Sequence, residues 1–228
     1  MISRNRAGVF LRVEAVLFDL DGVLVDSTAS IERAWRSWAE SSAVSWDRVL
    51  PHVHGRRAVE TICQVFPEMS AERVRAEADA VNALQVRDPQ IVAIRGALEL
   101  LAAVPARSWA VVTASPAELA LARLRYAGFT PPRIIVSAGD VDEGKPDPAC
   151  YRLAARRIGA EPSKCLVVED APSGVRAAKS AGMRCLALLT THRRAELEDA
   201  DAAVGDLADI EIVAEDRQAF TVNVRSPR

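Results

Sequence analysis

Two apolar segments of this 228-residue chain end in closely spaced acidic residues. Asp19 and Asp21 stand at the end of the first segment, and Glu169 and Asp170 stand at the end of another, far along the chain. Carboxylates this close together are unfavourable unless a proton or a cation compensates their charge. Their oxygen atoms suit a hard divalent cation such as Mg²⁺. Each pair alone also fits a structural role, because acidic side chains complement the N-terminal ends of helices.

Two further segments carry groups that suit an anionic ligand. Thr113 and Ala114 end a third apolar segment, where a hydroxyl and free backbone N–H groups could hold a phosphoryl oxygen. Lys145 stands between Gly144 and Pro146, which fix its position, so it could supply a localised positive charge. Taken singly, Thr113 is better explained as a hydroxyl at a strand end, and a lone loop lysine is normally only solvated.

Together these groups predict phosphoryl transfer. A divalent cation and Lys145 would neutralise a phosphate dianion, so that Asp19 could attack phosphorus and form an aspartyl phosphate. Asp21 would protonate the leaving alcohol and later deprotonate the water that hydrolyses the intermediate. The fold must then bring the ends of these distant segments together.

Short apolar segments alternate with helical patterns along most of the chain. This alternation predicts an α/β fold with a parallel sheet and helices on both faces, in which ligands bind beyond the carboxyl ends of the strands. The expected strands are Val13–Asp19, Trp109–Thr113, Ile134–Ser137, Cys165–Glu169 and Arg184–Leu189. The expected helices between them are Pro116–Tyr126, Pro148–Ile158 and Gly174–Ala181.

One stretch interrupts this alternation. From about Thr28 to Arg87 the sequence has no strand candidate, and we expect helices at Ala29–Ser41, Arg56–Phe66 and Ala71–Gln85. We interpret residues 28–87 as a helical cap domain inserted after the first strand, and residues 1–27 with 88–228 as the catalytic core. Such a cap would cover the strand ends where the ligand binds. The polar segment 214–228 is not assigned to any element.

The composition excludes several classes of protein. Half of the residues are hydrophobic and 26% are charged, as in ordinary globular proteins, and a net charge of −2 offers no basic excess for nucleic acid. The apolar runs are too short to span a membrane, and we expect no signal peptide. The four cysteines are widely spaced, so we expect reduced, mostly buried thiols in a cytoplasmic protein.

From Glu14 to about His192, the chain resembles the haloacid dehalogenase (HAD) superfamily. The stretches that match its four motifs, in their usual order, are D-L-D-G-V-L-V-D-S, V-V-T-A-S, G-K-P-D-P and V-V-E-D-A-P-S-G-V-R-A-A-K-S-A-G-M. The resemblance implies a Rossmann-like three-layer core, a small all-helical cap of the phosphoglucomutase-like branch, and Mg²⁺-dependent phosphoryl transfer. It also implies that Asp19 is the nucleophile and that Asp21 is the acid and base.

The same resemblance implies roles for the remaining motif residues. The residues implied to bind the phosphoryl group are Thr113, Ala114 and Lys145. Magnesium would be bound by Asp19, Asp170 and the main-chain carbonyl of Asp21. Glu169 would be a further carboxylate of the metal site, acting directly or through water.

Single positions separate the members of this superfamily. Dehalogenases lack the second aspartate, which is present here as Asp21, and β-phosphoglucomutases have a histidine where this chain has Ile31. Phosphonoacetaldehyde hydrolases need a cap lysine, and segment 28–87 contains none. We therefore expect a phosphatase acting on a sugar or polyol phosphate. The alternatives are a phosphoglycolate phosphatase, a β-phosphoglucomutase-type phosphomutase, or a phospho-ligand-binding protein without activity.

The cap segment His54, Gly55 and Arg56 resembles the cap of sugar- and glycerol-phosphate phosphatases, and these residues are candidates for substrate selection. Arg56 could contact a phosphate or a hydroxyl group, and His54 could donate a hydrogen bond to one. Equally, the segment could be a solvated loop in which Arg56 and Arg57 pair with surface acids. We expect a small phosphorylated metabolite as ligand, no nucleic-acid or membrane partner, and a monomer or weak homodimer.

Overall fold

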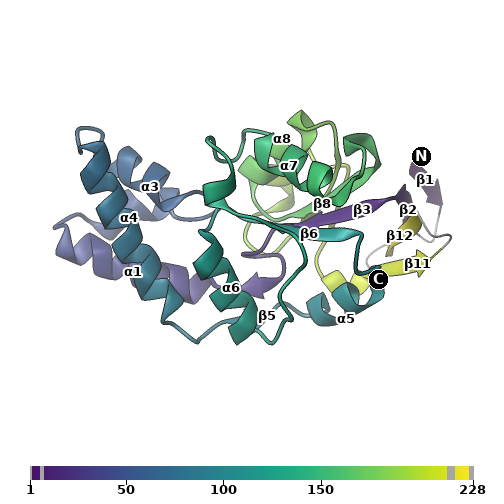
Figure 1. Cartoon of the computed structure of the whole chain (residues 1–228), viewed down its shortest axis with the longest axis horizontal. Coiled ribbons are helices and arrows are strands. Elements are labelled where there is room, and N and C mark those ends of the chain that lie inside the picture. The colour runs from purple at the N-terminus through teal and green to yellow at the C-terminus, as the bar shows by residue number, and fades with distance from the viewer. Residues whose placement is uncertain (1, 6–7, 215–218, 226–228) are drawn as a thin grey trace.

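A six-stranded parallel sheet forms the centre of the molecule (Figure 1). The computed structural model describes residues 2–5, 8–214 and 219–225. The strand order is β10-β9-β8-β3-β6-β7, and every neighbouring pair is parallel. The strands are β3 (Ala15–Phe18), β6 (Trp109–Val112), β7 (Ile135–Val136), β8 (Cys165–Glu169), β9 (Arg184–Leu188) and β10 (Ala202–Val204). The α/β class is confirmed, and β10 adds an edge strand to those expected.

Helices cover both faces of this sheet. Alternate residues of β3 point to opposite faces, so that Val16 and Phe18 belong to one buried cluster and Ala15 and Leu17 to another. The first face is covered by α5 (Ala97–Ala103) and α6 (Ala117–Tyr126), and the second by α7 (Ala149–Ile158) and α8 (Pro172–Ser180). Short 3-10 helices are η2 (Ala138–Asp140), η3 (Pro162–Lys164), η4 (Arg194–Leu197) and η5 (Leu207–Asp209). In the described part of the chain, no helix combines the length and apolar character needed to cross a membrane.

The two ends of the chain form a four-stranded antiparallel sheet that the sequence analysis does not predict. Its order is β1-β2-β12-β11, comprising β1 (Ile2–Asn5), β2 (Gly8–Val13), β11 (Ile210–Ala214) and β12 (Phe220–Arg225). Val13 pairs with Phe220 in this sheet, so the expectation that it begins the first parallel strand is wrong. Phe220, Val222 and Val224 bury alternate side chains against the core, as in a sheet with one covered face. Part of segment 214–228 is therefore a strand, and its residues 215–218 and 226–228 lie outside the described residues.

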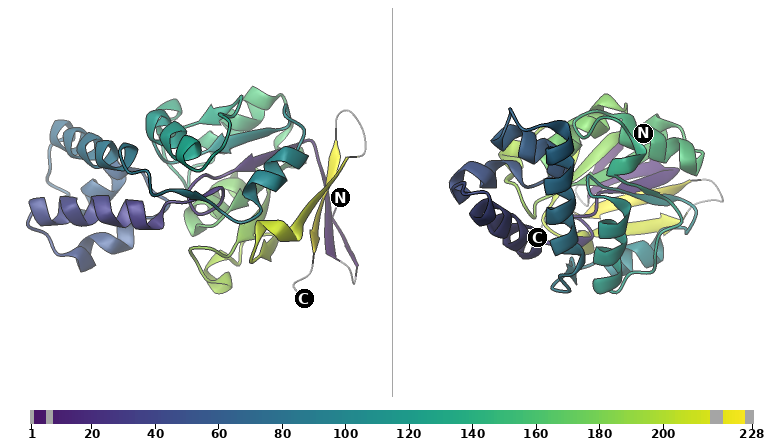
Figure 2. Two further views of the ribbon diagram at one scale, coloured as in Figure 1. Left: turned by 90° about the horizontal axis from the view of Figure 1, so that it is seen from below. Right: turned by 60° about the vertical axis from the view of Figure 1, so that its left-hand side comes forward.

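A helical cap lies at the opposite end of the molecule from the four-stranded sheet (Figure 2). Its helices are α1 (Thr28–Ser41), α2 (Trp46–Val49), η1 (Leu50–His52), α3 (Ala58–Val65) and α4 (Ala71–Val86). The cap has a hydrophobic core of its own, in which Trp35 and Trp38 meet edge to face with ring centroids 5.3 Å apart. Two short strands, β4 (Val25–Asp26) and β5 (Val92–Ala93), pair where the chain enters and leaves the cap. The all-helical cap is confirmed, and the domain limits at residues 28 and 87 stay a prediction.

Candidate active site

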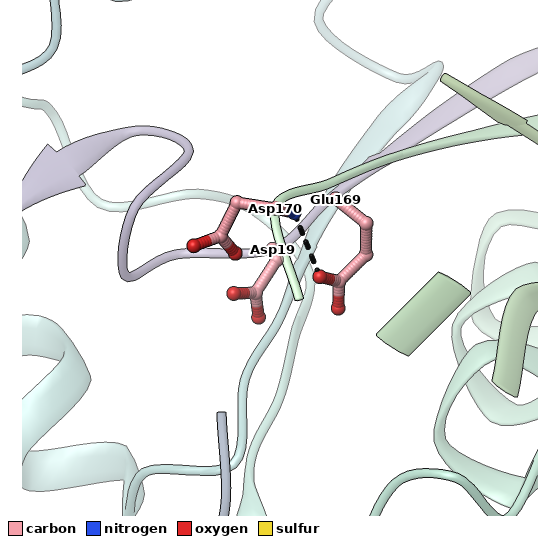
Figure 3. Close-up of side chains that lie close together, drawn as sticks. All are labelled: Asp19, Glu169 and Asp170. Carbon is pink, nitrogen blue, oxygen red and sulfur yellow. Dashed lines mark hydrogen bonds between the residues drawn. The ribbon is translucent and has the colours of Figure 1, made fainter. Parts of the chain in front are cut away.

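Three carboxyl groups meet at the ends of β3 and β8 (Figure 3). Asp19 follows β3, Glu169 ends β8, and Asp170 comes next. Because β3 and β8 are parallel neighbours, their carboxyl ends lie at the same edge of the sheet. One oxygen of each carboxyl group lies within 4.8 Å of the other two, and all three residues are buried. The arrangement could hold a metal ion, at the place where the sequence predicts one.

Two glycines make room for these carboxyl groups. Gly22 has a φ of +79°, and a Cβ atom there would lie 2.1 Å from Asp170 Oδ2. A Cβ atom at Gly174 would lie 1.6 Å from Glu169 Oε1. Each acidic pair is therefore followed by a glycine because no larger residue fits beside the cluster.

Lys145 connects two members of the cluster. Its Nζ lies 2.6 Å from Asp19 Oδ1 and 2.6 Å from Glu169 Oε1, and it also donates to the Val112 carbonyl at 3.3 Å. Burial lowers the pKa of Lys145, but the carboxylates of Asp19 and Glu169 raise it more, so the net shift is upward. The ammonium group is thus charged and fixed in position.

Glu169 has less capacity for a cation than the two aspartates. Its Oε1 accepts from the lysine and, at 2.8 Å, from the buried hydroxyl of Tyr151. Its Oε2 accepts from the backbone N–H groups of Asp170 at 2.9 Å and Ala171 at 3.0 Å. By contrast, no described residue donates to Asp19 Oδ2 or Asp170 Oδ1. The carboxylate oxygens that remain available belong to the aspartates.

The cluster sets three carboxyl groups against one lysine. Burial raises the pKa of Asp19 from 3.8 to about 7; Lys145 opposes this shift, and Glu169 and Asp21 add to it. Burial, with Glu169 and Asp19 beside it, also raises the pKa of Asp170 well above its ordinary value. One lysine does not compensate three buried carboxyl groups. A set of hard oxygen donors with excess negative charge fits a divalent cation.

Asp21 lines the same cavity but has separate partners. Ser27 donates to its Oδ1 at 2.6 Å, Arg123 Nη1 donates to its Oδ2 at 2.6 Å, and the Ser115 hydroxyl donates to Oδ2 at 3.3 Å. Asp19, in contrast, is buried against a lysine and two acidic residues. Two carboxyl groups in such different environments suit two different chemical roles.

Thr113 and Ala114 offer hydrogen-bond donors to the cavity that Asp19 and Lys145 also line. The Thr113 Oγ1 accepts from the Ser115 backbone N–H at 3.1 Å, which leaves its own proton available. Within the described residues, the backbone N–H of Ala114 has no acceptor. The end of β6 therefore presents two donors to an anion in this cavity.

The cap closes the other side of this cavity, which has a volume of about 50 Å³. Gly55 and Arg56 line it; Arg56 is exposed and makes no hydrogen bond or ion pair with the described residues. His54 does not line it, and burial lowers the pKa of its imidazole. Of the three cap residues expected to select the substrate, Gly55 and Arg56 line the cavity and His54 does not.

Polar contacts from Arg57 and Ser173 help to hold the cap against the core. The Arg57 guanidinium donates to the carbonyls of Asp142 at 2.8 Å and Val141 at 3.0 Å, and the Ser173 hydroxyl donates to the Gly55 carbonyl at 3.3 Å. Arg57 Nε also lies 3.7 Å from Glu60 Oε1 within the cap. Arg57 therefore forms an ion pair in the cap as well as hydrogen bonds to the core. The structure is therefore that of a closed cap.

Three buried polar residues at the site are missed by the sequence analysis. Arg123 donates to Asp21 and to Gln85, and the Tyr151 hydroxyl donates to Glu169. A signal exists for two of them, because each stands at a position where the helical period expects an apolar residue. The buried stripe of α4 that Gln85 continues comprises Val74, Ala78 and Val81. The buried stripe of α6 that contains Arg123 comprises Leu119, Ala120, Ala122 and Leu124.

Comparison with known proteins gives the same superfamily that the sequence motifs indicate. The haloacid dehalogenase-like hydrolase family model matches residues 13–182. Hexitol phosphatase A of Escherichia coli is 34% identical over 208 residues, which cover 89% of this chain and 95% of that protein. Validoxylamine A 7′-phosphate phosphatase of Streptomyces hygroscopicus is 36% identical over 204 residues, covering 86% and 95%. The crystal structure of a hydrolase from Pseudomonas syringae superposes with a TM-score of 0.78 at 27% identity, over 86% of this chain and 95% of that one.

The chain belongs to the haloacid dehalogenase-like hydrolase family, because the matching model covers well over half of it. Within that family, its similarity to phosphatases confirms the expected enzyme class, a phosphoric monoester hydrolase. The substrate and the roles of individual residues stay predictions at this point.

Proposed function

We propose that this protein is a Mg²⁺-dependent phosphatase that hydrolyses a small sugar or polyol phosphate through an aspartyl-phosphate intermediate. The observation that carries the proposal is the pair of differently held aspartates at one cavity. Asp19 lies 2.6 Å from the buried Lys145, and Asp21 lies 2.6 Å from Arg123. The first is placed to attack phosphorus, and the second to exchange a proton with an oxygen bonded to it.

Asp19 and Asp170 would hold the cation, because each keeps a carboxylate oxygen to which no described residue donates. The main-chain carbonyl of Asp21 is a third candidate ligand. Glu169 would act through water, since both of its oxygens already accept two hydrogen bonds from the protein. When bound, Mg²⁺ supplies the positive charge that lets a phosphate dianion approach an ionised carboxylate.

Three groups would hold the phosphoryl oxygens. Thr113 supplies a hydroxyl proton, Ala114 a backbone N–H, and Lys145 a fixed positive charge, and all three line the cavity beside Asp19. Because the lysine also bonds to Asp19, one side chain would orient the nucleophile and screen its charge from the substrate.

The reaction would proceed in two steps, formation and hydrolysis of the aspartyl phosphate. In the first, an Asp19 oxygen bonds to phosphorus while the bond from phosphorus to the substrate oxygen breaks, and protonated Asp21 gives its proton to that oxygen, so that a neutral alcohol leaves. In the second, the ionised Asp21 takes a proton from water as the water oxygen bonds to phosphorus. The bond to Asp19 then breaks, and orthophosphate leaves with both aspartates restored.

The substrate class is supported by the lining of the cavity and by one relative. From the cap, Arg56 and Asn82 offer hydrogen-bonding groups, while Trp35 and Ile31 offer apolar surface, which fits a short chain bearing hydroxyl groups. The similarity to hexitol phosphatase A supports a polyol phosphate. Ile31 favours hydrolysis over a phosphomutase, because it lines the cavity with 7% exposure and carries no group that could transfer a proton.

The test is phosphate release with Mg²⁺ from a panel containing hexitol, hexose and glycerol phosphates, phosphoglycolate and β-glucose 1-phosphate. Asp19→Asn serves as the blank. We expect turnover to be fastest on a hexitol, hexose or glycerol phosphate. Selective turnover of phosphoglycolate, or conversion of β-glucose 1-phosphate without phosphate release, would replace the proposed substrate class. A folded wild-type protein that releases no phosphate from any substrate would refute the phosphatase proposal.

A further inference from the structure

Arg123 is buried beneath the active site. It belongs to α6 of the core, has 2% exposure, and its Nη1 donates to Asp21 Oδ2 at 2.6 Å and to Ser115 Oγ at 2.8 Å. Its Nε has no partner among the described residues. Removing a guanidinium from water is costly, and a buried ion pair by itself is weak evidence for a stabilising role. An apolar side chain on this buried stripe of α6 would avoid that cost, so the arginine calls for a functional explanation.

The same guanidinium reaches the cap. Its Nη2 donates to Gln85 Oε1, and Gln85 is a buried residue near the end of α4, with 4% exposure. The amide of Gln85 is oriented in turn by donation from its Nε2 to the Val81 carbonyl at 3.4 Å. A continuous chain of contacts thus runs from a cap helix through Arg123 to Asp21.

Both carboxylate oxygens of Asp21 accept hydrogen bonds. Ser27, at the N-terminal end of α1, donates to Oδ1 at 2.6 Å, and Arg123 donates to Oδ2. Only the second hydrogen bond depends on a cap helix, through Gln85 near the C-terminal end of α4. If the cap moves off the core, Gln85 leaves Arg123, and one Nη2 proton loses its protein acceptor. The guanidinium is then no longer fixed, and neither is the orientation of the Asp21 carboxyl group.

We propose that Arg123 and Gln85 are positioning residues that couple closure of the cap to the orientation of Asp21. Proton transfer to the leaving alcohol is then assembled only when the cap lies on the core with substrate enclosed. The inference rests on the proposed function, because it needs Asp21 to act on a leaving group. It adds a route by which the cap controls the chemical step as well as access.

The test compares two substrates whose leaving groups differ in their need for a proton. An alkyl phosphate such as a hexitol phosphate needs its leaving oxygen protonated, whereas p-nitrophenyl phosphate releases a stable phenolate without that help. Gln85→Leu removes the acceptor at nearly constant volume, and Gln85→Glu restores one. We expect Gln85→Leu to lower kcat for the hexitol phosphate by about 10- to 100-fold, a part of the 10²–10⁴-fold that general acid catalysis provides. KM and the burst rate of nitrophenolate should change by less than about 3-fold, and Gln85→Glu should recover most of kcat.

The matched control is Gln64→Leu, the same substitution at an exposed glutamine on α3 outside the cavity, which should leave kcat on both substrates unchanged. Thermal unfolding of each variant checks the fold, and Arg123→Lys, which keeps the charge but not the fork of donors, should reproduce the Gln85→Leu pattern. Equal losses on both substrates, or no loss on either, would overturn the coupling while leaving the phosphatase intact. A wild-type protein inactive on both substrates would refute the proposed function and this inference with it.

Discussion

The core side and the cap side of the active-site cavity are built differently. On the core side, Lys145 contacts two carboxylates and a carbonyl, and each oxygen of Glu169 has two donors. On the cap side, Arg56 is exposed without a polar partner among the described residues, and the cap is held by a few hydrogen bonds to carbonyls. In the proposed reaction, the fixed groups would face the phosphoryl group that every substrate of the class shares. The free groups would face the part that varies from one substrate to another.

This difference makes distinct predictions for the two sides. Changes on the core side should alter turnover of every substrate, because they affect the common chemical step. Changes on the cap side should alter the order of substrates and leave a generic aryl phosphate nearly untouched. If a core-side substitution changed only the order of substrates, or a cap-side substitution slowed every substrate equally, the two sides would not be separable in function.

The largest effect is expected for Asp19→Asn. Without the nucleophile, turnover of every substrate should fall by several orders of magnitude, measured as phosphate release. The fold should persist, because burial and the neighbouring carboxylates raise the pKa of Asp19 and an amide of the same shape removes that buried charge. Thermal unfolding in the absence of divalent cations should therefore show a variant at least as stable as the wild type. Activity near the wild-type level would refute the role of Asp19.

Removal of divalent cations should have the next largest effect. In excess chelator, kcat should fall at least about 100-fold on a hexitol phosphate and on p-nitrophenyl phosphate alike, since the charge of the acidic cluster would repel either substrate. Added Mg²⁺ should restore it. Undiminished turnover in chelator would show that Lys145 alone compensates the cluster.

A smaller and selective effect is expected for Arg56→Ala. Its guanidinium lines the cavity and has no structural partner in the described part of the chain, so its loss should leave the melting temperature unchanged. We expect kcat/KM to fall about 10-fold for the preferred sugar or polyol phosphate, the worth of one charge-assisted hydrogen bond, with little change for p-nitrophenyl phosphate. Equal losses on both would assign the arginine to the shared chemistry.

The smallest effect concerns His54 and the stability of the protein in acid. Burial lowers the pKa of this histidine from 6.5; Glu32 and Asp21 oppose the shift, and His192 adds to it. The folded state then binds fewer protons than the unfolded state, so stability should fall as the pH drops below about 6.5. Between pH 7 and 5 the melting temperature of His54→Gln should fall less than that of the wild type, with His52→Gln as the control. Parallel curves for wild type and His54→Gln would contradict the lowered pKa of this half-buried imidazole.

The sequence predicts the core side of the site far better than the rest. Asp19 and Asp170 stand at the ends of parallel strands, where local pattern and topology suffice to bring them together, and Lys145 stands in a short Gly-Lys-Pro segment whose pattern can also be recognised. Arg123 and Gln85 are single polar residues on otherwise apolar helical stripes. Such a pattern indicates burial but does not identify a partner, because the partner lies on another element.

The terminal sheet escapes prediction for a related reason. Leu11 and Val13 alternate with less buried residues, as in an antiparallel strand, but they run directly into the fully buried β3. The partner strand, Phe220–Arg225, lies at the other end of the chain. Local pattern can indicate each strand, whereas their pairing depends on contacts between residues about 200 positions apart.

That pairing sets an order of events during synthesis. The ribosome makes β2 about 200 residues before β12, its partner in the sheet. Strands β3, β6 and β8 and the whole cap can leave the exit tunnel before the terminal sheet can form. Until then, the apolar side chains of β2 and the face of the core beneath them stay open to solvent. The nascent chain thus carries an unpaired edge of β2 while the core strands and the cap are being made, the state in which chaperone binding or aggregation competes with folding.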